Sequence, residues 1–295
     1  MYAAIVPVIP EVQLKKVMVA TDFSPSSAAA VHMAQLLARH YGSEVIIANI
    51  WTIPALAETN PEAVGPGSVL AQEAAQAQLQ NLASSDLLKD LKVKSILRFG
   101  DPISEIGSLV DAEKIDLLLL GTHGGGKVSR AFLGSVAESL IRDVPCPVLT
   151  MGPSLQQRFL EENRLADVLV PTDLSAHSLA VIPYLTAVTA DFHSNVHFLH
   201  VMSEEPAEGL PAITKVQEKM ERHCGCHFSP RTMTSCGVEF GDVATQVLAA
   251  AHLRHSDLIA MGVRPGGRFV THLKANVGYQ IIANAPCPVL TVKHA

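Results

Sequence analysis

The chain contains the segment Pro145-Cys146-Pro147-Val148-Leu149-Thr150 twice, and the second copy is Pro286-Cys287-Pro288-Val289-Leu290-Thr291, 141 residues further along. With the same offset, Phe99-Gly100-Asp101 recurs as Phe240-Gly241-Asp242. The repeat unit is too long for a solenoid module and long enough for a hydrophobic core of its own. These segments therefore indicate one domain that occurs twice.

A third repeat lies nearer the N-terminus and defines the expected domains. Val19-Ala20-Thr21-Asp22-Phe23-Ser24 corresponds to Val170-Pro171-Thr172-Asp173-Leu174-Ser175 at an offset of 151, so the first copy has ten additional residues before the other repeats. We expect a first domain over residues 1–152 and a linker over 153–164, next to a chain-breaking Gly-Pro-Ser. A second domain is expected over residues 165–295.

Short apolar runs alternate with longer segments of helical pattern in both copies. Val45-Ile46-Ile47-Ala48 and Leu117-Leu118-Leu119-Leu120 are apolar at consecutive positions, which is typical of strands buried on both faces of a parallel sheet. Ser24-Pro25 and Asp101-Pro102 provide the N-cap and first-turn residues of the helices that follow. Each copy is therefore predicted as βαβαβαβαβ, a doubly wound α/β domain with a parallel sheet flanked by helices. The expected strands are Lys16–Ala20, Glu44–Ile50, Val93–Phe99, Asp116–Leu120 and Cys146–Met151, then Val168–Pro171, Val196–Val201, Arg231–Phe240, Asp257–Met261 and Pro288–Val292.

The composition argues against several classes of protein. The chain has 295 residues, 48% of them hydrophobic and 17% charged, which disfavours disorder. Its longest stretch without Asp, Glu, Lys or Arg has 18 residues, fewer than the roughly 20 that a membrane-spanning helix needs, and the N-terminus lacks the basic region of a signal peptide. There are 11 basic and 15 acidic residues through Gly152, and 11 and 13 afterwards, so neither domain has the net positive charge typical of nucleic-acid binding. We expect a cytoplasmic protein that binds neither membrane nor nucleic acid.

A glycine-rich loop follows the fourth expected strand. In a doubly wound sheet, ligands bind at the carboxyl ends of the strands, where Thr21-Asp22 and Gly121-Thr122-His123-Gly124-Gly125-Gly126-Lys127 are expected. Gly134-Ser135 then begins the next helical segment, whose free amides and hydroxyl are suited to phosphate. The loop is not a Walker A motif, because Val128 stands where the magnesium-binding hydroxyl belongs, and Ser129 breaks the dinucleotide fingerprint. A purely structural turn is the alternative interpretation.

The spacing Gly121-x2-Gly124-x9-Gly134-Ser135, with Thr21-Asp22 and Pro145-Cys146-Pro147-Val148, resembles the universal stress protein family in its tandem two-domain form. The resemblance covers nearly the whole chain. It implies a five-stranded parallel sheet of strand order 3-2-1-4-5 in each domain, and an adenine nucleotide (ATP, ADP or AMP) between the first and fourth strands. The residues that it implies are Gly121, His123, Gly124, Gly134, Ser135 and Val136 for the triphosphate, Asp22 or the loop glycines for the ribose, and Ala20, Thr21 and Ile50 for adenine.

The resemblance also implies that the last strands of the two domains, Cys146–Met151 and Pro288–Val292, pair within one chain. The tandem would then imitate a dimer, and a homodimer of whole chains stays open. For Asp22 we favour a ligand role, with the ribose or with a magnesium ion on the phosphates. For Asp173, its counterpart in the second copy, we favour a role in loop structure.

The second copy departs from the family pattern at the loop that would hold phosphate. Gly262 is kept, but Pro265, Ala275 and Asn276 replace the second glycine, the third glycine and the serine. Proline removes an amide donor, and alanine adds a Cβ where the backbone must approach phosphate. We therefore expect a single competent site, in the first domain. A solvated basic rim is favoured over a side-chain anion site for Arg264, Arg268 and Lys274.

Histidine and cysteine side chains raise further possibilities in the second copy. Four potential metal ligands lie within five residues: His223, Cys224, Cys226 and His227. For this segment, a polar helix end is favoured over metal binding or thiol redox sensing. Cys146 and Cys287 are interpreted as inert core thiols, and His200 as a packing residue in an apolar strand.

The function expected from these features is a stress-response protein that binds ATP or a related nucleotide in its first domain and is not an enzyme. No residue near the loop resembles an activated nucleophile or a tuned general base, and slow hydrolysis beside His123 stays open. One alternative is an adenylate-transferring enzyme of the related nucleotide-binding α-hydrolase group, which Thr21-Asp22-Phe23-Ser24-Pro25 argues against because it lacks their signature loop. The other alternative is an interaction scaffold that binds no nucleotide.

Overall fold

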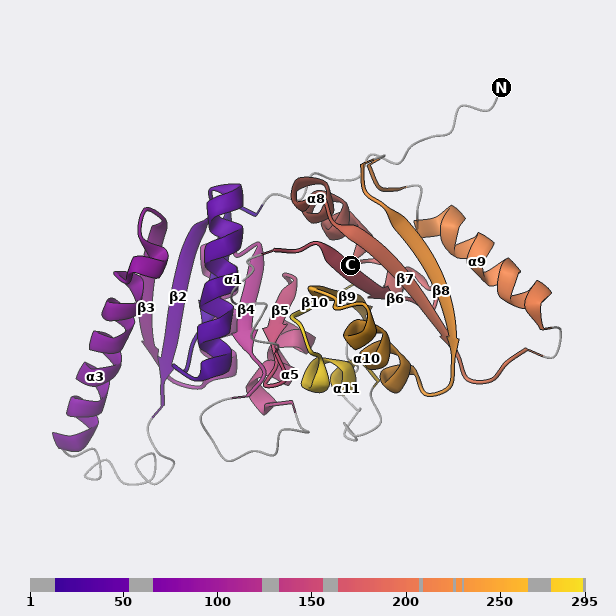
Figure 1. Ribbon diagram of the computed structural model, residues 1–295. Coiled ribbons are helices and arrows are strands. Elements are labelled where there is room, and N and C mark those ends of the chain that lie inside the picture. The colour runs from indigo at the N-terminus through magenta and orange to yellow at the C-terminus, as the bar shows by residue number, and fades with distance from the viewer. Residues whose placement is uncertain are drawn as a thin grey trace.

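The computed structural model describes residues 14–52, 66–123, 133–155, 164–206, 209–224, 227–229, 231–264 and 277–293. Within them, one ten-stranded sheet runs through the molecule in the order β3-β2-β1-β4-β5-β10-β9-β6-β7-β8 (Figure 1). Strands β5 and β10 are antiparallel, and the other neighbours are parallel. Each half therefore has the strand order 3-2-1-4-5, which confirms the predicted fold class.

The first half contains β1 (Lys16–Ala20), α1 (Pro25–Tyr41), β2 (Glu44–Trp51), α3 (Pro66–Ala83), the 3-10 helix η2 (Asp86–Leu88), β3 (Lys92–Phe99), α4 (Pro102–Glu113), β4 (Leu117–Gly121), α5 (Ser135–Asp143) and β5 (Val148–Met151). The second half contains β6 (Asp167–Pro171), α7 (Ala176–Leu179), α8 (Ile182–Phe192), β7 (Asn195–Met202), α9 (Leu210–Cys224), β8 (Thr234–Phe240), α10 (Val243–Leu253), β9 (Leu258–Val263), α11 (Val277–Asn284) and β10 (Val289–Lys293). All ten predicted strands are present, with their ends shifted by a few residues.

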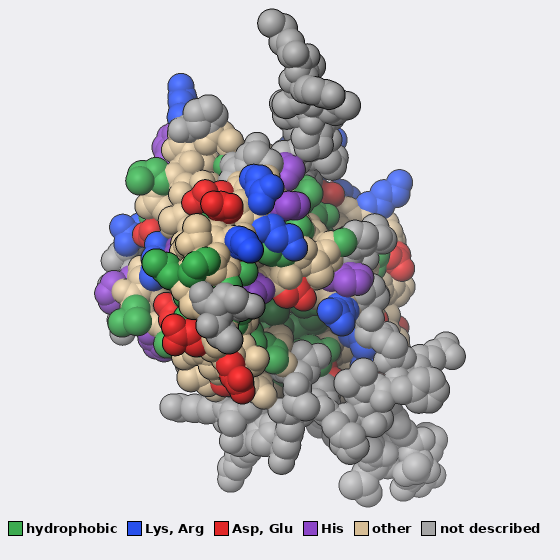
Figure 2. Space-filling model, turned by 90° about the vertical axis from the view of Figure 1, so that its right-hand side faces the viewer, with side chains coloured by type: hydrophobic (Ala, Val, Ile, Leu, Met, Phe, Trp, Pro, Cys, Tyr) green, Lys and Arg blue, Asp and Glu red, His purple; other side chains and the backbone are tan. Residues whose placement is uncertain are grey.

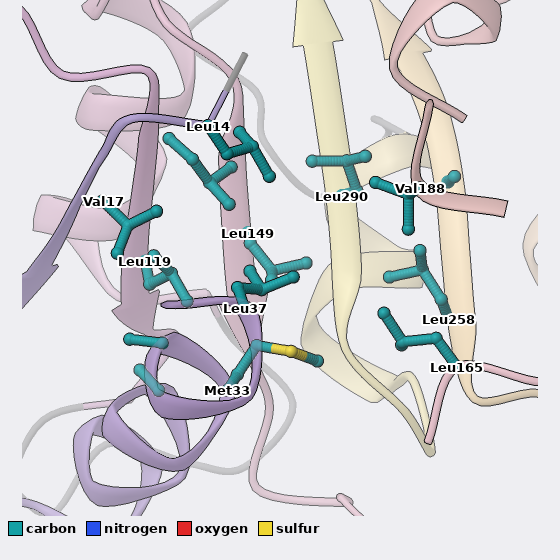
Figure 3. Close-up of a cluster of buried hydrophobic side chains, with 14 of the residues drawn as sticks. Leu14, Val17, Met33, Leu37, Leu119, Leu149, Leu165, Val188, Leu258 and Leu290 are labelled. Carbon is teal, nitrogen blue, oxygen red and sulfur yellow. The ribbon is translucent and has the colours of Figure 1, made fainter. Parts of the chain in front are cut away.

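The inner strands of the sheet are buried on both faces by two layers of helices, whereas the outer strands β3 and β8 are partly exposed. Successive side chains of a strand point to opposite faces, so Val17 and Val19 of β1 join one apolar cluster while Met18 joins the other. The first cluster takes side chains from α1, α3, α8 and α9, and the second from α4, α5, α10 and α11. Figure 3 shows Leu149 of β5 and Leu290 of β10 within the first cluster. The core is thus continuous from one half to the other.

The boundary between the halves is the antiparallel pair β5–β10, which is formed by the repeated Pro-Cys-Pro-Val-Leu-Thr segment. Leu149 lies opposite Leu290 in the register. The Thr150 hydroxyl donates to Val289 O at 3.2 Å, and the Thr291 hydroxyl donates to Val148 O at 3.1 Å. Both threonines are buried, so each hydroxyl needs a partner within the protein. The repeated threonine therefore makes one reciprocal pair of hydrogen bonds across this boundary, which we call the seam.

The repeated Phe-Gly-Asp segment forms the turn between a strand and the next helix. Gly100 and Gly241 have φ values of +143° and +117°, which side chains other than glycine rarely adopt. Asp101 and Asp242 then cap α4 and α10, accepting from the amides of Ser104 and Thr245 at 2.9 Å. This motif therefore has a structural explanation in both halves.

The first helix differs between the halves. In the first half α1 is continuous over 17 residues. Its counterpart in the second half is divided into α7 and α8, and Pro183 lies in the first turn of α8. Proline removes a backbone donor and fits a helix only in its first turn, so it accounts for the division.

Figure 2 shows the face of the molecule over α9 and β8. Lys and Arg side chains stand among Asp, Glu and His side chains there, and they do not form a continuous basic surface. None of the described helices is long and apolar enough to cross a membrane.

A close approach between the first helix and the fourth strand recurs in both halves. A Cβ added at Gly121, the last residue of β4, would lie 2.8 Å from Ser26 Cβ and 2.9 Å from Ser27 N. A Cβ added at Gly262 would overlap with the carbonyl oxygen of His177. Glycine at these two positions is therefore required by packing, which explains why Gly262 is kept although the second loop has lost other glycines.

Replacing Gly262 by alanine should destabilise the protein, because the added methyl group meets backbone atoms that cannot move aside cheaply. We expect Gly262→Ala and Gly121→Ala each to lower the free energy of unfolding by about 1–3 kcal/mol in denaturant titrations. Gly107→Ala in α4 is the matched control: nothing lies within 4 Å of its added Cβ, so a small gain is expected. Unchanged stability of Gly262→Ala would contradict the packing explanation.

In the second half, a half-buried histidine and a glycine occupy the positions of two isoleucines of the first half. His197 of β7 lies against Gly237 of β8, and a Cβ added at Gly237 would be 2.9 Å from His197 Nε2. The corresponding positions of the first half are Ile46 and Ile96. His197 Nδ1 is 2.8 Å from Ser235 Oγ. Burial, together with the charge of Arg254, lowers the pKa of His197 to about 4.

Acid should therefore destabilise the second half through His197. Because the folded state favours the neutral ring, its contribution is complete above about pH 6.5 and is lost as the pH falls through 4. Allowing for solvent screening, we expect a loss of about 1–2 kcal/mol in the free energy of unfolding that is absent in His197→Asn. The exposed His252→Asn should keep the wild-type pH profile. Identical profiles for wild type and His197→Asn would refute this assignment.

Candidate functional site

The candidate site lies where the connections of the first sheet change direction. Strand β1 pairs with β2 on one side and with β4 on the other, with Ala20 opposite Leu120. The loops that follow β1 and β4 therefore meet at the carboxyl edge of the sheet. Open α/β sheets bind their ligands at this switch point.

The loop after β1 is ordered by hydrogen bonds within the chain. The hydroxyl of Thr21 accepts from Phe23 N and lies 3.0 Å from Ser27 Oγ. Asp22 Oδ1 accepts from Ser24 N at 3.0 Å, and Ser24 Oγ caps α1 by accepting from Ser27 N. Burial acts to raise the pKa of Asp22, but the hydrogen bonds that the carboxylate accepts, chiefly from Ser24 and Ser27, together outweigh it and the pKa is lowered. Asp22 is consequently an anion at neutral pH.

The second half builds the same loop from the repeated residues. The hydroxyl of Thr172 accepts from Leu174 N, and Asp173 Oδ1 accepts from Ser175 N at 2.9 Å. Ser175 Oγ caps α7 by accepting from Ser178 N. The Thr-Asp-x-Ser motif thus orders the loop in both halves. The sequence assigned Asp22 and Asp173 different roles, whereas the structure gives their carboxylates the same backbone contact.

One polar residue of the site was missed by the sequence analysis. Asn49 of β2 is buried, and its Nδ2 donates to Thr21 O at 2.7 Å. His200, at the same position of the second half, donates from Nδ1 to Thr172 O at 2.8 Å. Interpreting His200 as a packing residue was therefore incomplete. Polar side chains at the same place in two apolar strands were the available signal.

The loop after β4 is held against the start of α1. His123 O accepts from Ser26 Oγ at 3.1 Å and from Ser24 Oγ at 3.4 Å. The ring nitrogen His123 Nδ1 is 2.8 Å from Thr122 Oγ1, which also donates to Met151 O. These contacts fix the beginning of the glycine-rich loop. The remainder of that loop, including Gly124, lies outside the described residues.

Helix α5 begins next to this loop. Gly134 is its N-cap residue and provides no side chain to cap it. Gly134 N donates to Thr122 O at 2.9 Å, and a Cβ added at Gly134 would lie 2.9 Å from the same oxygen. The first turn of α5, with exposed Ser135 and half-buried Val136, therefore starts beside the end of β4. Its amides and the positive end of the helix dipole favour an anion.

The structure brings most of the predicted site residues to one edge of the sheet. Ile50 is on β2 beside β1, and like Ala20 it packs against the cluster that includes α4 and α5. The predicted residues that the structure places along this edge are Ala20, Thr21, Asp22, Ile50, Gly121, His123, Gly134, Ser135 and Val136.

The equivalent place in the second half is spanned by an ion pair. Arg264 Nη2 lies 3.8 Å from Asp173 Oδ2. Burial acts to raise the pKa of Asp173, but hydrogen bonds from Ser175 and Ser178 and the charge of Arg264 lower it to about 2. Arg264 thus has an acidic partner in its own chain. The other residues singled out in this loop lie outside the described residues: Pro265, Arg268, Lys274, Ala275 and Asn276.

The histidine–cysteine segment at the end of α9 is only partly described. His223 Nδ1 contacts Lys219 O at 2.8 Å, Cys224 is buried in the core and His227 is half-buried. Cys226 lies outside the described residues. Over the part of the chain that the structure places, no three His, Cys, Asp or Glu residues gather as metal ligands. Burial raises the pKa of Cys146 to about 11, as expected of an unreactive thiol.

Comparison with known proteins identifies the family. The model of the universal stress protein family matches residues 13–151 and again residues 166–293. A universal stress protein of Methanocaldococcus jannaschii is 30% identical over 141 residues, which are 46% of this chain and 81% of that protein. One from Thermus aquaticus is 26% identical over 138 residues, 46% of this chain and 96% of that protein.

A solved structure has the same fold over the whole length. The crystal structure of a universal stress protein from Archaeoglobus fulgidus superposes with a TM-score of 0.72 at 20% identity, covering 96% of this chain and 100% of that one. The match of the family model to two successive segments, which together make up most of the sequence, leads to one conclusion: this chain belongs to the universal stress protein family.

Proposed function

We propose that the first half binds ATP or another adenine nucleotide and that the protein acts as a stress-response binding protein rather than through turnover. The start of α5 carries this proposal. Gly134 N is tied to Thr122 O, which places the first turn of α5 beside the end of β4 with no capping side chain at its N-cap. A helix start of this kind at a switch point is suited to phosphate.

The assignments within the site follow the family pattern and the geometry. The phosphates are proposed to contact the first turn of α5, His123 and the glycine-rich loop. Asp22 is proposed to face the ribose, or a magnesium ion on the phosphates. Adenine is proposed to lie near Ala20, Thr21 and Ile50.

The second half is proposed to lack a nucleotide site. It builds the same loop after its first strand, so the difference must come from the fourth strand and the helix that follows. There, Arg264 pairs with Asp173 across the switch point. The replacements at Pro265, Ala275 and Asn276 remove features that phosphate needs. We propose domain boundaries at 152 and 165, which agree with the gap between the two matched segments.

Nucleotide binding should depend on the start of α5. Isothermal titration of protein freed of carried-over nucleotide is expected to give one ATP per chain. Gly134→Val should weaken affinity at least roughly tenfold, because its Cβ displaces the first turn from Thr122 O. Ser135→Ala should weaken it about threefold to tenfold by removing one hydroxyl, and Ser139→Ala, one turn further along α5, should leave it unchanged.

Thermal unfolding of each variant separates loss of the site from loss of the fold. A flat titration of the wild type with ATP, ADP and AMP would favour the interaction scaffold instead. Tight binding that Gly134→Val leaves intact would mean that the nucleotide sits elsewhere, for instance in the second half.

Turnover should be negligible. The described residues of the site offer His123 as the titratable ring next to the loop, with its Nδ1 contacting Thr122 Oγ1. Release of phosphate or pyrophosphate from ATP should stay within a few-fold of buffer and should be the same in His123→Ala. Release far above buffer that is lost in His123→Ala would show an enzyme.

A further inference from the structure

The seam raises the question of which strand β5 pairs with, β10 of the same chain or β5 of a second chain. Because both halves contribute the same Pro-Cys-Pro-Val-Leu-Thr segment, β5 of one chain carries the groups needed to pair with β5 of another. The reciprocal bonds of Thr150 and Thr291 would form equally well between two like halves. Strand pairing therefore does not distinguish the opposite half from a second copy of the same half.

The side chains that flank the strands are not symmetric. Lys293, at the end of β10, donates from Nζ to Arg142 O at the end of α5, at 2.9 Å. With the offset of 141, the first half has Gly152 in place of Lys293. Two first halves would therefore bring no ammonium group to this carbonyl oxygen.

A second asymmetry lies between α5 and α11. Glu138 and Tyr279 occupy equivalent positions of the two halves. Tyr279 packs against the apolar cluster to which α5 contributes Ala137, Leu140 and Ile141, and the charge of Glu138 acts to raise the pKa of Tyr279 across the seam. Burial raises the pKa of Glu138, which Arg142 partly offsets, and burial raises the pKa of Tyr279, with a smaller contribution from Glu138. The other charged groups facing this place are Asp143 of α5 and Lys293 of β10.

The opposite face of the sheet shows that equivalent residues meet at the seam. Tyr41 at the end of α1 and Phe192 at the end of α8 are separated by the offset of 151, and their rings lie 6.3 Å apart between centroids. The ring of His40 lies 4.4 Å from that of Phe192. Tyr41 and Phe192 thus approach each other as equivalent residues would around an approximate two-fold axis.

We propose that the seam surface of each half is complementary to the opposite half and not to its own kind, and that Glu138 and Tyr279 set this preference. In a pair of two first halves, Glu138 would meet a second Glu138. Two half-buried carboxylates near an axis repel each other, because both cannot be ionised without cost. In the observed pair, a tyrosine takes the place of the second carboxylate.

This arrangement combines attraction for the correct partner with repulsion against the wrong one. The hydrogen bond from Lys293 to the Arg142 carbonyl provides the attraction in the observed pair. In a pair of two first halves, the two Glu138 carboxylates would provide the repulsion. The pairing partner that fits the first half is therefore the second half, with its Tyr279 and Lys293. A second copy of the first half lacks both.

The test exchanges the two residues in the full-length protein. Tyr279→Glu creates two glutamates at the seam, Glu138→Tyr creates two tyrosines, and the double variant restores one of each in swapped positions. Equilibrium unfolding is measured at pH 8 and at pH 5, because repulsion between two carboxylates is relieved as they take up protons at lower pH. Glu73→Tyr on exposed α3 is the matched control.

We expect Tyr279→Glu to raise the unfolding equilibrium constant at least tenfold at pH 8 and clearly less at pH 5. Glu138→Tyr should lack this pH dependence, because it brings no second carboxylate. The swapped double variant should recover most of the stability at pH 8. The proposal is overturned if the double variant loses as much unfolding free energy as the two single variants lose together. It is also overturned if Tyr279→Glu loses the same unfolding free energy at both pH values.

Discussion

The antiparallel pairing of β5 with β10 is the contact on which the rest of the architecture depends. It joins two five-stranded sheets into one, and the apolar clusters on both faces continue across it. Without it, β5 and β10 would be edge strands, and the buried hydroxyls of Thr150 and Thr291 would lose their acceptors. The pairing also supports the candidate site. Thr122 O accepts from Gly134 N at the start of α5, and Thr122 N and Oγ1 both donate to the carbonyl oxygen of Met151 in β5.

The two halves are built on one scaffold. Their first loops are built by the same hydrogen bonds, and their fourth strands end in glycines that the first helix approaches closely. These shared features belong to folding. A difference in ligand binding must come from residues that the halves do not share, and in the first half those are concentrated at the start of α5. In the second half, Arg264, at the position equivalent to His123, forms an ion pair with Asp173.

Several motifs were recognised in the sequence before their physical reason was known. The family resemblance assigns Gly121 to phosphate, and the structure adds a packing reason, because a Cβ added at this position would collide with Ser26 and Ser27. Asn49 was not singled out, since a lone asparagine in an apolar strand gives no indication of which carbonyl it will meet. The division of α7 from α8 had a visible cause in Pro183, whereas the hydrogen bond from Lys293 to Arg142 O joins residues that are 151 positions apart.

The sequence alone determined the duplication, the alternation of strands and helices and the edge of the sheet at which a ligand would bind. These follow from local rules: consecutive apolar residues make buried strands, Ser and Asp before proline cap helices, and parallel strands end at the same edge. Only the tertiary structure decided which glycines are needed for packing, which carbonyls Asn49 and His200 contact, and how Lys293 meets the first half. Such contacts join atoms far apart in the chain, and their distances exist only once both cores are packed.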